Sequence, residues 1–332
     1  MNYNEIKIGI LGSGQLGRMI SIAASRLGIR SHIYAPDAKN SPAADVSSFY
    51  TNASYTNEAS LKQFANSVDV ITCEFENVPF QTINYLSNYK LVSPGNDALK
   101  TSQNRILEKK LAQSLNIPVP KYWVIRSKKE LELAQNELNH EGVLKTTTQG
   151  YDGKGQKTIT KKDNPSIIWN NFTSKEAILE EKIKFSSEAS FLIWRYKNGK
   201  KGFFPPTTNE HVNGILYRSK SPTNLSKETI LTGKKYAYKI ADKLNLIGLL
   251  ALETFILNDE LVIFNEIAPR PHNSYHWTIE GCKTSQFEQL IRTILNIPEG
   301  TVETNGNFCM QNILGEDFIK VKKYFLTKKY FI

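Results

Sequence analysis

Two glutamates, Glu253 and Glu266, lie in neighbouring apolar segments that we predict to be strands, Leu249–Leu257 and Glu260–Ile267. If a two- or four-residue loop joins these strands, the two-residue period of a strand places both carboxylates on one face, roughly 5–8 Å apart. A three-residue loop would break this arrangement. An idle charge in such apolar strands would cost on the order of several kcal/mol. Because magnesium prefers carboxylate oxygens, we predict a metal-binding pair rather than two exposed glutamates.

A glycine-rich loop, Gly150-Tyr151-Asp152-Gly153-Lys154-Gly155-Gln156, follows a short predicted strand that ends at Lys145. Its three glycines allow backbone N–H groups to approach an anion, and the two lysines add positive charge. The segment is not a Walker loop, because no Gly-Lys-Ser/Thr sequence opens a helix. An ordinary hairpin turn is the alternative, but the position of Lys145 on the strand favours a phosphate-binding loop.

A dense polar run, Arg270-Pro271-His272-Asn273-Ser274, comes directly after the strand that carries Glu266. Arginine, histidine, asparagine and serine side chains so close together can form an anion-binding wall, and the prolines stiffen the loop. Each residue alone is compatible with a structural role. The cluster beside a predicted metal pair indicates a binding site.

The amino-terminal segment carries Gly12, Gly14 and Gly17 in a G-x-G-x-x-G pattern between a predicted strand and a predicted helix. Asp37 follows at about the distance expected of a ribose-binding acid. By itself the pattern suggests a nicotinamide enzyme. A tight turn with close helix packing needs glycine too, so the motif alone does not decide.

The elements that must position these residues fall into two stretches. The first 95 or so residues alternate strand and helix, which is typical of a parallel α/β unit. The later part contains further strands, a long amphipathic helix and a hinge at Ile117–Pro120. The predicted strands are Ile6–Leu11, Ser31–Tyr34, Asp69–Cys73, Gly142–Lys145, Ile178–Ile183 and Glu188–Tyr196, and the predicted helices are Glu58–Ala65, Ala98–Leu115 and Lys227–Leu244.

The composition favours a packed protein that handles small phosphorylated molecules. The chain has 332 residues, 40% of them hydrophobic, and a formal charge of +10 that is spread along its length without a nucleic-acid-binding motif. Three widely spaced cysteines indicate free thiols in a reducing cytosol. The longest apolar stretch, Leu246–Leu257, is interrupted by Glu253, and the first residues lack a signal-peptide pattern. We therefore expect a cytoplasmic protein without a membrane or nucleic-acid partner.

Taken together, these motifs resemble the ATP-grasp family, and within it the enzymes that carboxylate aminoimidazole ribonucleotide in purine biosynthesis. The Asn265–Ser274 run is the most specific match, and the amino-terminal glycine turn resembles a non-nucleotide version of that fold. The matching segments, in family order, are Gly12–Gly17, Glu74–Pro79, Arg105 with Glu108 and Lys109, Lys145 with Gly150–Gln156, Phe185–Glu188, Asn209–Leu216, Asn265–Thr278 and Ser285–Glu288.

The resemblance implies an α/β architecture in three parts. These are a Rossmann-like (pre-ATP-grasp) domain at 1–95, an ATP-grasp domain at 96–300 with a mobile lid at about 121–178, and an incomplete β-rich C-terminal domain at 301–332. It also implies an ADP-forming carbon–nitrogen ligase that uses ATP, magnesium and bicarbonate to carboxylate 5-aminoimidazole ribonucleotide through carboxyphosphate, as a homodimer. The alternatives are a related ligase, such as the formate-dependent glycinamide ribonucleotide transformylase, or an ATP-binding protein with impaired turnover.

The resemblance further implies roles for the matching residues. For ATP they are Arg105, Lys145 and the loop of Gly150, Tyr151, Asp152, Gly153, Lys154, Gly155 and Gln156 at the phosphates, Glu180, Glu181, Lys182 and Ile183 at the adenine, Glu188 at the ribose, and His211, Asn265 and Glu266 nearby. Magnesium would be bound by Glu253 and Glu266. The acceptor substrate would face Glu76, Tyr151, Asp152, Arg270, His272, Asn273 and Ser274, with Lys154, Arg270 and Asn273 as catalytic groups.

Two departures from the family pattern carry expectations of their own. Tyr275 occupies a position where the family has a small residue, so we expect it to crowd the phosphate site or to redirect the loop. The sequence ends at Ile332, before a basic segment that binds the substrate phosphate in the family. We therefore expect ATP binding with strongly impaired use of the ribonucleotide, unless the basic run Lys320–Lys329 substitutes.

Overall fold

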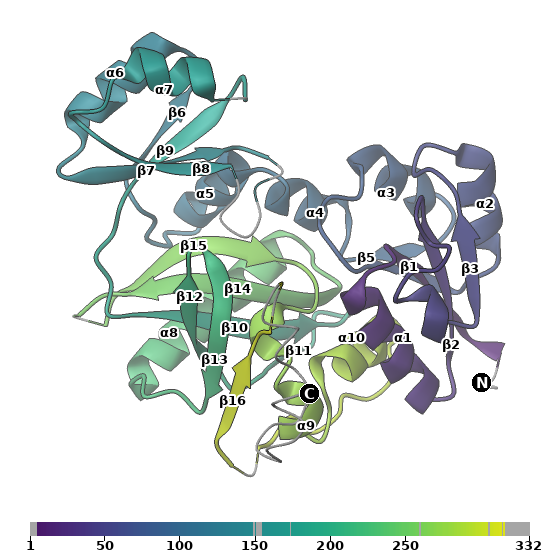
Figure 1. The fold of residues 1–332 in the computed structure, drawn as a ribbon. Coiled ribbons are helices and arrows are strands. Elements are labelled where there is room, and N and C mark those ends of the chain that lie inside the picture. The colour runs from purple at the N-terminus through teal and green to yellow at the C-terminus, as the bar shows by residue number, and fades with distance from the viewer. Residues whose placement is uncertain are drawn as a thin grey trace.

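The computed structural model describes residues 5–148, 150, 155–172, 174–258, 260–304, 306–313 and 315. These residues form a five-stranded, a seven-stranded and a four-stranded sheet with helices packed on them (Figure 1). The residues that we expected to do chemistry come mostly from the second and third sheets and the loops beside them, with Arg105 on a helix and Glu76 in a loop of the first sheet.

The first sheet is parallel, in the order β3-β2-β1-β4-β5. Its central strands are apolar runs because both faces are covered by helices, as in doubly wound folds. The predicted strands and the helix after the glycine turn are present, whereas β3, α3 and β5 were not predicted. The elements are β1 (Lys7–Leu11), α1 (Gln15–Arg26), β2 (Arg30–Ala35), η2 (Ala44–Val46), β3 (Phe49–Asn52), α2 (Glu58–Asn66), β4 (Val70–Cys73), α3 (Phe80–Ser87) and β5 (Leu91–Ser93).

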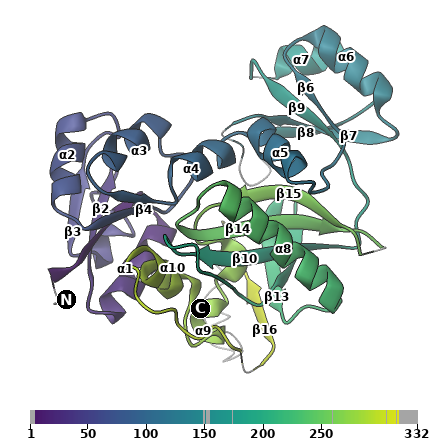
Figure 2. The ribbon, with the colours of Figure 1, turned by 180° about the vertical axis from the view of Figure 1, so that it is seen from behind.

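The large sheet has the order β15-β14-β10-β12-β13-β16, with β11 paired to β10. Helix α8 (Lys227–Lys243) covers one of its faces, which is seen in Figure 2. The strands are β10 (Ser187–Arg195), β11 (Lys201–Phe203), β12 (Thr207–Val212), β13 (Ile215–Ser221), β14 (Gly248–Ile256), β15 (Val262–Ala268) and β16 (Phe308–Gln311).

The third sheet stands apart from the other two in both ribbon views (Figures 1 and 2). Its order is β6-β9-β7-β8, and α6 and α7 pack on one face. The elements are β6 (Tyr122–Ile125), α6 (Lys128–Glu137), β7 (Glu141–Thr146), β8 (Gln156–Thr160), α7 (Pro165–Asn171) and β9 (Ala177–Glu181). This sheet has a hydrophobic core of its own.

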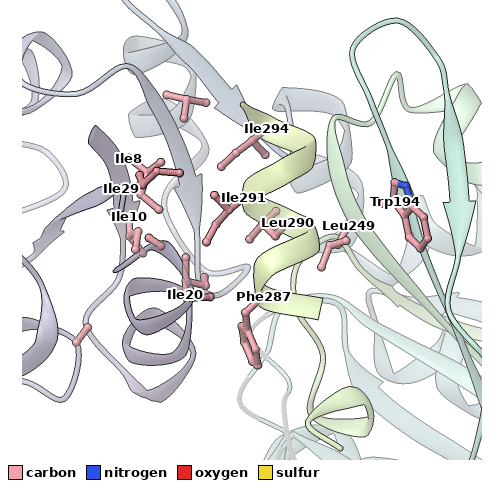
Figure 3. Packing of buried hydrophobic residues seen from close by; sticks show 14 of the residues in the cluster. Ile8, Ile10, Ile20, Ile29, Trp194, Leu249, Phe287, Leu290, Ile291 and Ile294 are labelled. Carbon is pink, nitrogen blue, oxygen red and sulfur yellow. The ribbon is translucent and has the colours of Figure 1, made fainter. Parts of the chain in front are cut away.

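Helix α10 (Gln286–Ile294) joins the first sheet to the large sheet. Its apolar residues lie in one buried cluster with side chains of β1, α1 and β14 (Figure 3). Ile291 and Leu290 are at most 1% exposed, so water is excluded from this junction. Segments from opposite ends of the chain therefore share a core, which fixes the amino-terminal unit against the large sheet.

One sequence expectation needs correction here. The single helix expected over 98–115 is two helices, α4 (Asn96–Ser102) and α5 (Arg105–Ser114). The break comes at Asn104, whose side chain accepts from the N–H groups of Ile106 and Leu107 and so caps α5. Of the expected separate unit at 301–332, the described part contributes β16, which is an edge strand of the large sheet. Residues 316–332, including the Lys320–Lys329 run, lie outside the described residues.

Among the described residues, none of the helices combines the length and the apolar character needed to span a bilayer.

Candidate active site

Glu253 on β14 and Glu266 on β15 are direct cross-strand partners, so the prediction of a shared face is confirmed. The turn, however, is not of the length that this prediction assumed. The Leu257 N–H donates to the Leu261 carbonyl at 3.1 Å, which leaves three residues between the paired positions. With that turn alone Glu253 would lie opposite Asn265. A register shift of one residue beside Glu253, a β-bulge, brings Glu266 opposite it instead.

Each of the two carboxylates has a basic partner. Arg105 Nη1 lies 2.8 Å from Glu266 Oε2, and His272 Nε2 lies 2.7 Å from Glu253 Oε1. Burial alone would raise the pKa of Glu266, but the charges of Arg105 and Lys145 hold it at about 2. Glu266 is therefore ionised at neutral pH, and the pair presents negative charge to the space between the second and third sheets.

A second buried charge cluster lies behind this pair. Lys145 Nζ and Lys109 Nζ lie 3.1 and 3.3 Å from the same oxygen of Glu180, and Lys109 also donates to the Asn265 carbonyl at 2.9 Å. Burial would raise the pKa of Glu180, but the two lysines hold it at about 2. Burial lowers the pKa of Lys109. The charge that an anion in the cleft would meet is therefore that of Lys145, which lines it.

A cleft of ≈ 790 Å³ opens between the second and third sheets, a size suited to a nucleotide. Phe185 stacks on Phe255 at its edge with 4.8 Å between ring centroids, and His211 Nδ1 lies 2.5 Å from Glu188 Oε2. The cleft gathers most of the residues that we expected around ATP and magnesium: Arg105, Lys145, Gly150, Gln156, Glu180, Glu181, Lys182, Ile183, Glu188, His211, Glu253, Asn265 and Glu266.

A smaller cavity of ≈ 170 Å³ adjoins this cleft on the side of the first sheet. Arg270 Nη2 lies 2.6 Å from Glu76 Oε1 in its wall, which joins the loop after β4 to the loop after β15. The expected substrate residues Glu76, Arg270, His272 and Asn273 all line this cavity. Both cavities are lined by Arg105, Gly150, His211, Gly214, Glu253 and Glu266, so they meet at the carboxylate pair.

Some expected site residues are placed differently or not at all. Tyr151, Asp152, Gly153 and Lys154 lie outside the described residues. Gly155 does not line the cleft. Its carbonyl accepts from the Thr146 N–H at the end of β7. Ser274, expected to face substrate, is fully buried because its hydroxyl is turned to His272 Nδ1 at 2.8 Å. It orients His272 and does not reach the cavity.

Tyr275 lies in the core, so the expectation that it crowds the phosphate site is wrong. Its side chain is fully buried, and its hydroxyl donates to the Ser190 carbonyl at 2.7 Å and accepts from the Leu192 N–H at 3.0 Å. Strand β10 changes partner at this point, from β12 to β11. The hydroxyl satisfies backbone groups that would otherwise be unpaired, and it ties the 270–276 loop to the large sheet.

Glu108 and Lys109 belong to the segments that match the family, but no role is predicted for either from the sequence. The Glu108 carboxyl accepts from the Ile267 N–H at 2.9 Å, and burial followed by the charge of Glu266 raises its pKa to about 8. Lys109 is 1% exposed. The sequence offers no signal for this burial, because four of the ten residues of α5 are charged and the segment looks like an ordinary solvated helix.

The carboxylate pair fits a divalent cation. Glu253 and Glu266 face each other across the ladder and offer the oxygen ligands that magnesium prefers. The described residues contain no cluster of three or more potential metal ligands. Magnesium in such sites keeps several waters and phosphate oxygens, so two carboxylates suffice.

Comparison with known proteins agrees with this geometry. The model of the ATP-grasp domain matches residues 110–287, and that of the ribonucleotide synthetase preATP-grasp domain matches residues 6–103. A bifunctional purine synthesis protein of Dictyostelium discoideum is 40% identical, over 97% of this chain and 34% of its own length. An N5-carboxyaminoimidazole ribonucleotide synthase of Bacillus subtilis is 37% identical, over 95% of this chain and 83% of its own length.

Solved structures agree as well. The ADP complex of an N5-carboxyaminoimidazole ribonucleotide synthetase superimposes with a TM-score of 0.92 at 38% identity, covering 97% of this chain and 85% of the other. The Aspergillus clavatus synthase in complex with ADP and 5-aminoimidazole ribonucleotide gives 0.87 at 28% identity, covering 94% and 83%. The chain therefore belongs to the ATP-grasp family of ADP-forming ligases and, within it, to the family of N5-carboxyaminoimidazole ribonucleotide synthases.

Proposed function

We propose that this chain uses ATP and bicarbonate to carboxylate the amine of 5-aminoimidazole ribonucleotide, releasing ADP and phosphate. The observation that carries the proposal is the meeting of the two cavities at Glu253 and Glu266. A nucleotide in the larger cavity would point its terminal phosphate at an acceptor in the smaller one. The relatives named above are synthases of this product, and one was solved with ADP and this ribonucleotide.

In this proposal the larger cleft binds ATP. Lys145 and Arg105 would supply positive charge for the phosphates, with Lys109 behind them. Glu188 would bind the ribose hydroxyls. Glu253 and Glu266 would bind magnesium, which when bound neutralises charge on the phosphate oxygens. Phosphoryl transfer depends mainly on positioning and charge neutralisation, so these residues need supply no covalent nucleophile.

The chemistry then proceeds in two steps. A bicarbonate oxygen attacks the γ-phosphorus, the bond to the β-phosphate oxygen breaks, and carboxyphosphate and ADP result. The substrate amine attacks the carboxyl carbon, the carbon–oxygen bond to phosphate breaks, and phosphate leaves with the amine proton. Arg270, held by Glu76, and Asn273 line the cavity in which this carboxyl group would form. Lys154, the third expected catalytic group, lies outside the described residues.

The lid belongs to the same proposal. The expected lid, about 121–178, includes most of the four-stranded sheet, which carries Lys145 and ends at Glu181. Closure of this sheet over the cleft would exclude water from carboxyphosphate. From the resemblance we also propose a homodimer that works in the cytoplasm. Light scattering of the purified chain at several concentrations measures its mass directly.

ADP release across candidate substrates tests the function. We expect stimulation by 5-aminoimidazole ribonucleotide that requires both magnesium and bicarbonate. The size of the stimulation also tests the sequence-based expectation of strongly impaired ribonucleotide use. Stimulation by glycinamide ribonucleotide with formate, and not by 5-aminoimidazole ribonucleotide with bicarbonate, would indicate the function of the related transformylase instead. ATP binding without stimulation by either pair would make the chain a nucleotide-binding protein without turnover.

A further inference from the structure

The G-x-G-x-x-G turn is the one motif that the proposed function leaves unused, and it is occupied by a side chain of the protein itself. Glu74, directly after β4, accepts from the N–H of Gly14 through Oε1 and from the N–H of Gly17 through Oε2, each at 2.5 Å. Glu74 is 6% exposed. It lies at the start of α1, where unpaired N–H groups and the helix dipole favour an anion.

The glycines of the motif are required by this arrangement. Gly12 has φ +111°, and a Cβ built there would lie 2.3 Å from Glu74 Cγ. A Cβ on Gly17 would lie 2.9 Å from Glu74 Oε2. In a dinucleotide site the same glycines admit a pyrophosphate. Here they admit a carboxylate that comes 60 residues after Gly14 in the sequence, so a bound phosphate and Glu74 would compete for the same N–H groups.

We call the binding of the Glu74 carboxylate by the N–H groups of Gly14 and Gly17 the clamp. The loop that begins at Glu74 continues into the wall of the smaller cavity. Two residues after Glu74, Glu76 is ion-paired with Arg270 at 2.6 Å. The same stretch of backbone is held from the other side by Gln103 Nε2, which donates to the carbonyls of Glu76 and Val78 at 2.7 Å each. The loop between β4 and α3 is thus fixed at both ends, with the Glu76 side chain between them.

We propose that Glu74 is a positioning residue: its carboxylate occupies the anion site of the glycine turn and thereby fixes Glu76 opposite Arg270. Glu74 itself does not line either cavity. The inference rests on the proposed function in that Glu76 and Arg270 face the ribonucleotide. The inference gives the glycine motif a structural role, in which it binds a carboxylate of the chain itself and neither a dinucleotide nor ATP.

Three variants test this. Glu74→Gln keeps the size and loses the charge, Glu74→Ala vacates the turn, and Ser13→Ala is the matched control. Ser13 is in the same turn, but its hydroxyl donates to Asp37 at 2.8 Å and not to Glu74. The measurements are KM for 5-aminoimidazole ribonucleotide, kcat, Kd for ATP by calorimetry, and the unfolding temperature, each with and without acetate.

Loss of charge-assisted hydrogen bonds should raise KM about 10- to 100-fold in both Glu74 variants, with kcat and the Kd for ATP changed less than about threefold. Acetate, a carboxylate that can enter the vacated turn, should lower KM and raise the unfolding temperature of Glu74→Ala. It should do neither in the wild type or in Ser13→Ala.

The inference is overturned if both Glu74 variants keep the wild-type KM. It is equally overturned if KM and the Kd for ATP rise together and acetate restores nothing, because Glu74 would then serve only folding. A wild type that releases no ADP with this ribonucleotide would refute the proposed function instead. In that case the acetate-dependent unfolding temperature of Glu74→Ala still decides whether the turn binds a carboxylate, and no shift would refute the clamp.

Discussion

Replacing Glu266 by glutamine removes one charge from the carboxylate pair and leaves its shape. Opposite unit charges about 4 Å apart attract by roughly 4 kcal/mol at the effective dielectric of a partly exposed site, which corresponds to about a thousandfold. Mutation of residues that only support a metal ligand already weakens metal affinity by about 10- to 100-fold. Loss of a ligand charge should therefore cost more than this and up to the Coulombic limit, so we expect Glu266→Gln to lose about 100- to 1,000-fold in turnover.

The fold should survive this change. The amide oxygen of a glutamine can still accept from Arg105, which lies 2.8 Å from Glu266 in the wild type. Loss of that ion pair is partly offset because the repulsion from Glu253 disappears. Since the Glu266 side chain is 38% exposed, water screens both effects, and the free energy of unfolding should change by no more than about 1–2 kcal/mol.

The assay is ADP release at saturating ribonucleotide over a range of magnesium concentrations, with Glu132→Gln on the exposed face of α6 as the charge-matched control. Glu266→Gln should need far more magnesium and should not recover full turnover. The control should behave as the wild type. Turnover by Glu266→Gln within about threefold of the wild type would contradict the reasoning, because a ligand charge would then not matter at this position.

Three further predictions follow from buried contacts. Lys109→Met leaves Glu180 with one lysine. We expect the free energy of unfolding, measured by denaturation, to fall by about 1–3 kcal/mol and ATP binding, measured by calorimetry, to weaken about 10-fold. Unchanged values would refute the shared-charge cluster. Gly17→Ala should destabilise by about 1–3 kcal/mol in the same denaturation assay, although alanine favours helices, because its Cβ meets Glu74; a gain in stability would refute the clamp. Burial lowers the pKa of His32 from 6.5 to about 4, so the unfolded chain binds this proton first. The contribution of His32 to the free energy of unfolding should therefore be constant above pH 6.5 and should decrease as the pH falls toward 4. In His32→Gln this decrease should be absent.

The carboxylate pair shows how far strand periodicity reaches. Alternation along two apolar segments sufficed to predict that Glu253 and Glu266 share a face. It could not predict the three-residue turn together with a compensating bulge, because a bulge leaves no periodic signal in either strand. Two departures from the assumed geometry cancelled, and the prediction held for a reason that the sequence did not contain.

Long-range contacts were the part that sequence reasoning missed. The glycine turn was correctly placed between strand and helix, but its anion is Glu74, far along the chain. Lys109 and Glu180 meet only because the third sheet folds back over α5. The conflict at Tyr275 disappears because its ring turns into the core, a choice of side-chain direction that the residue type alone does not decide.

The central claim is that a terminal phosphate in the larger cavity is transferred to bicarbonate in the smaller one. Turnover with ¹⁸O-labelled bicarbonate tests it directly, by mass spectrometry of the released phosphate. If carboxyphosphate forms, each phosphate carries one oxygen from bicarbonate, because the phosphorus–oxygen bond made in the first step is kept in the second. Phosphate without label, released at a rate indifferent to bicarbonate, would contradict the account.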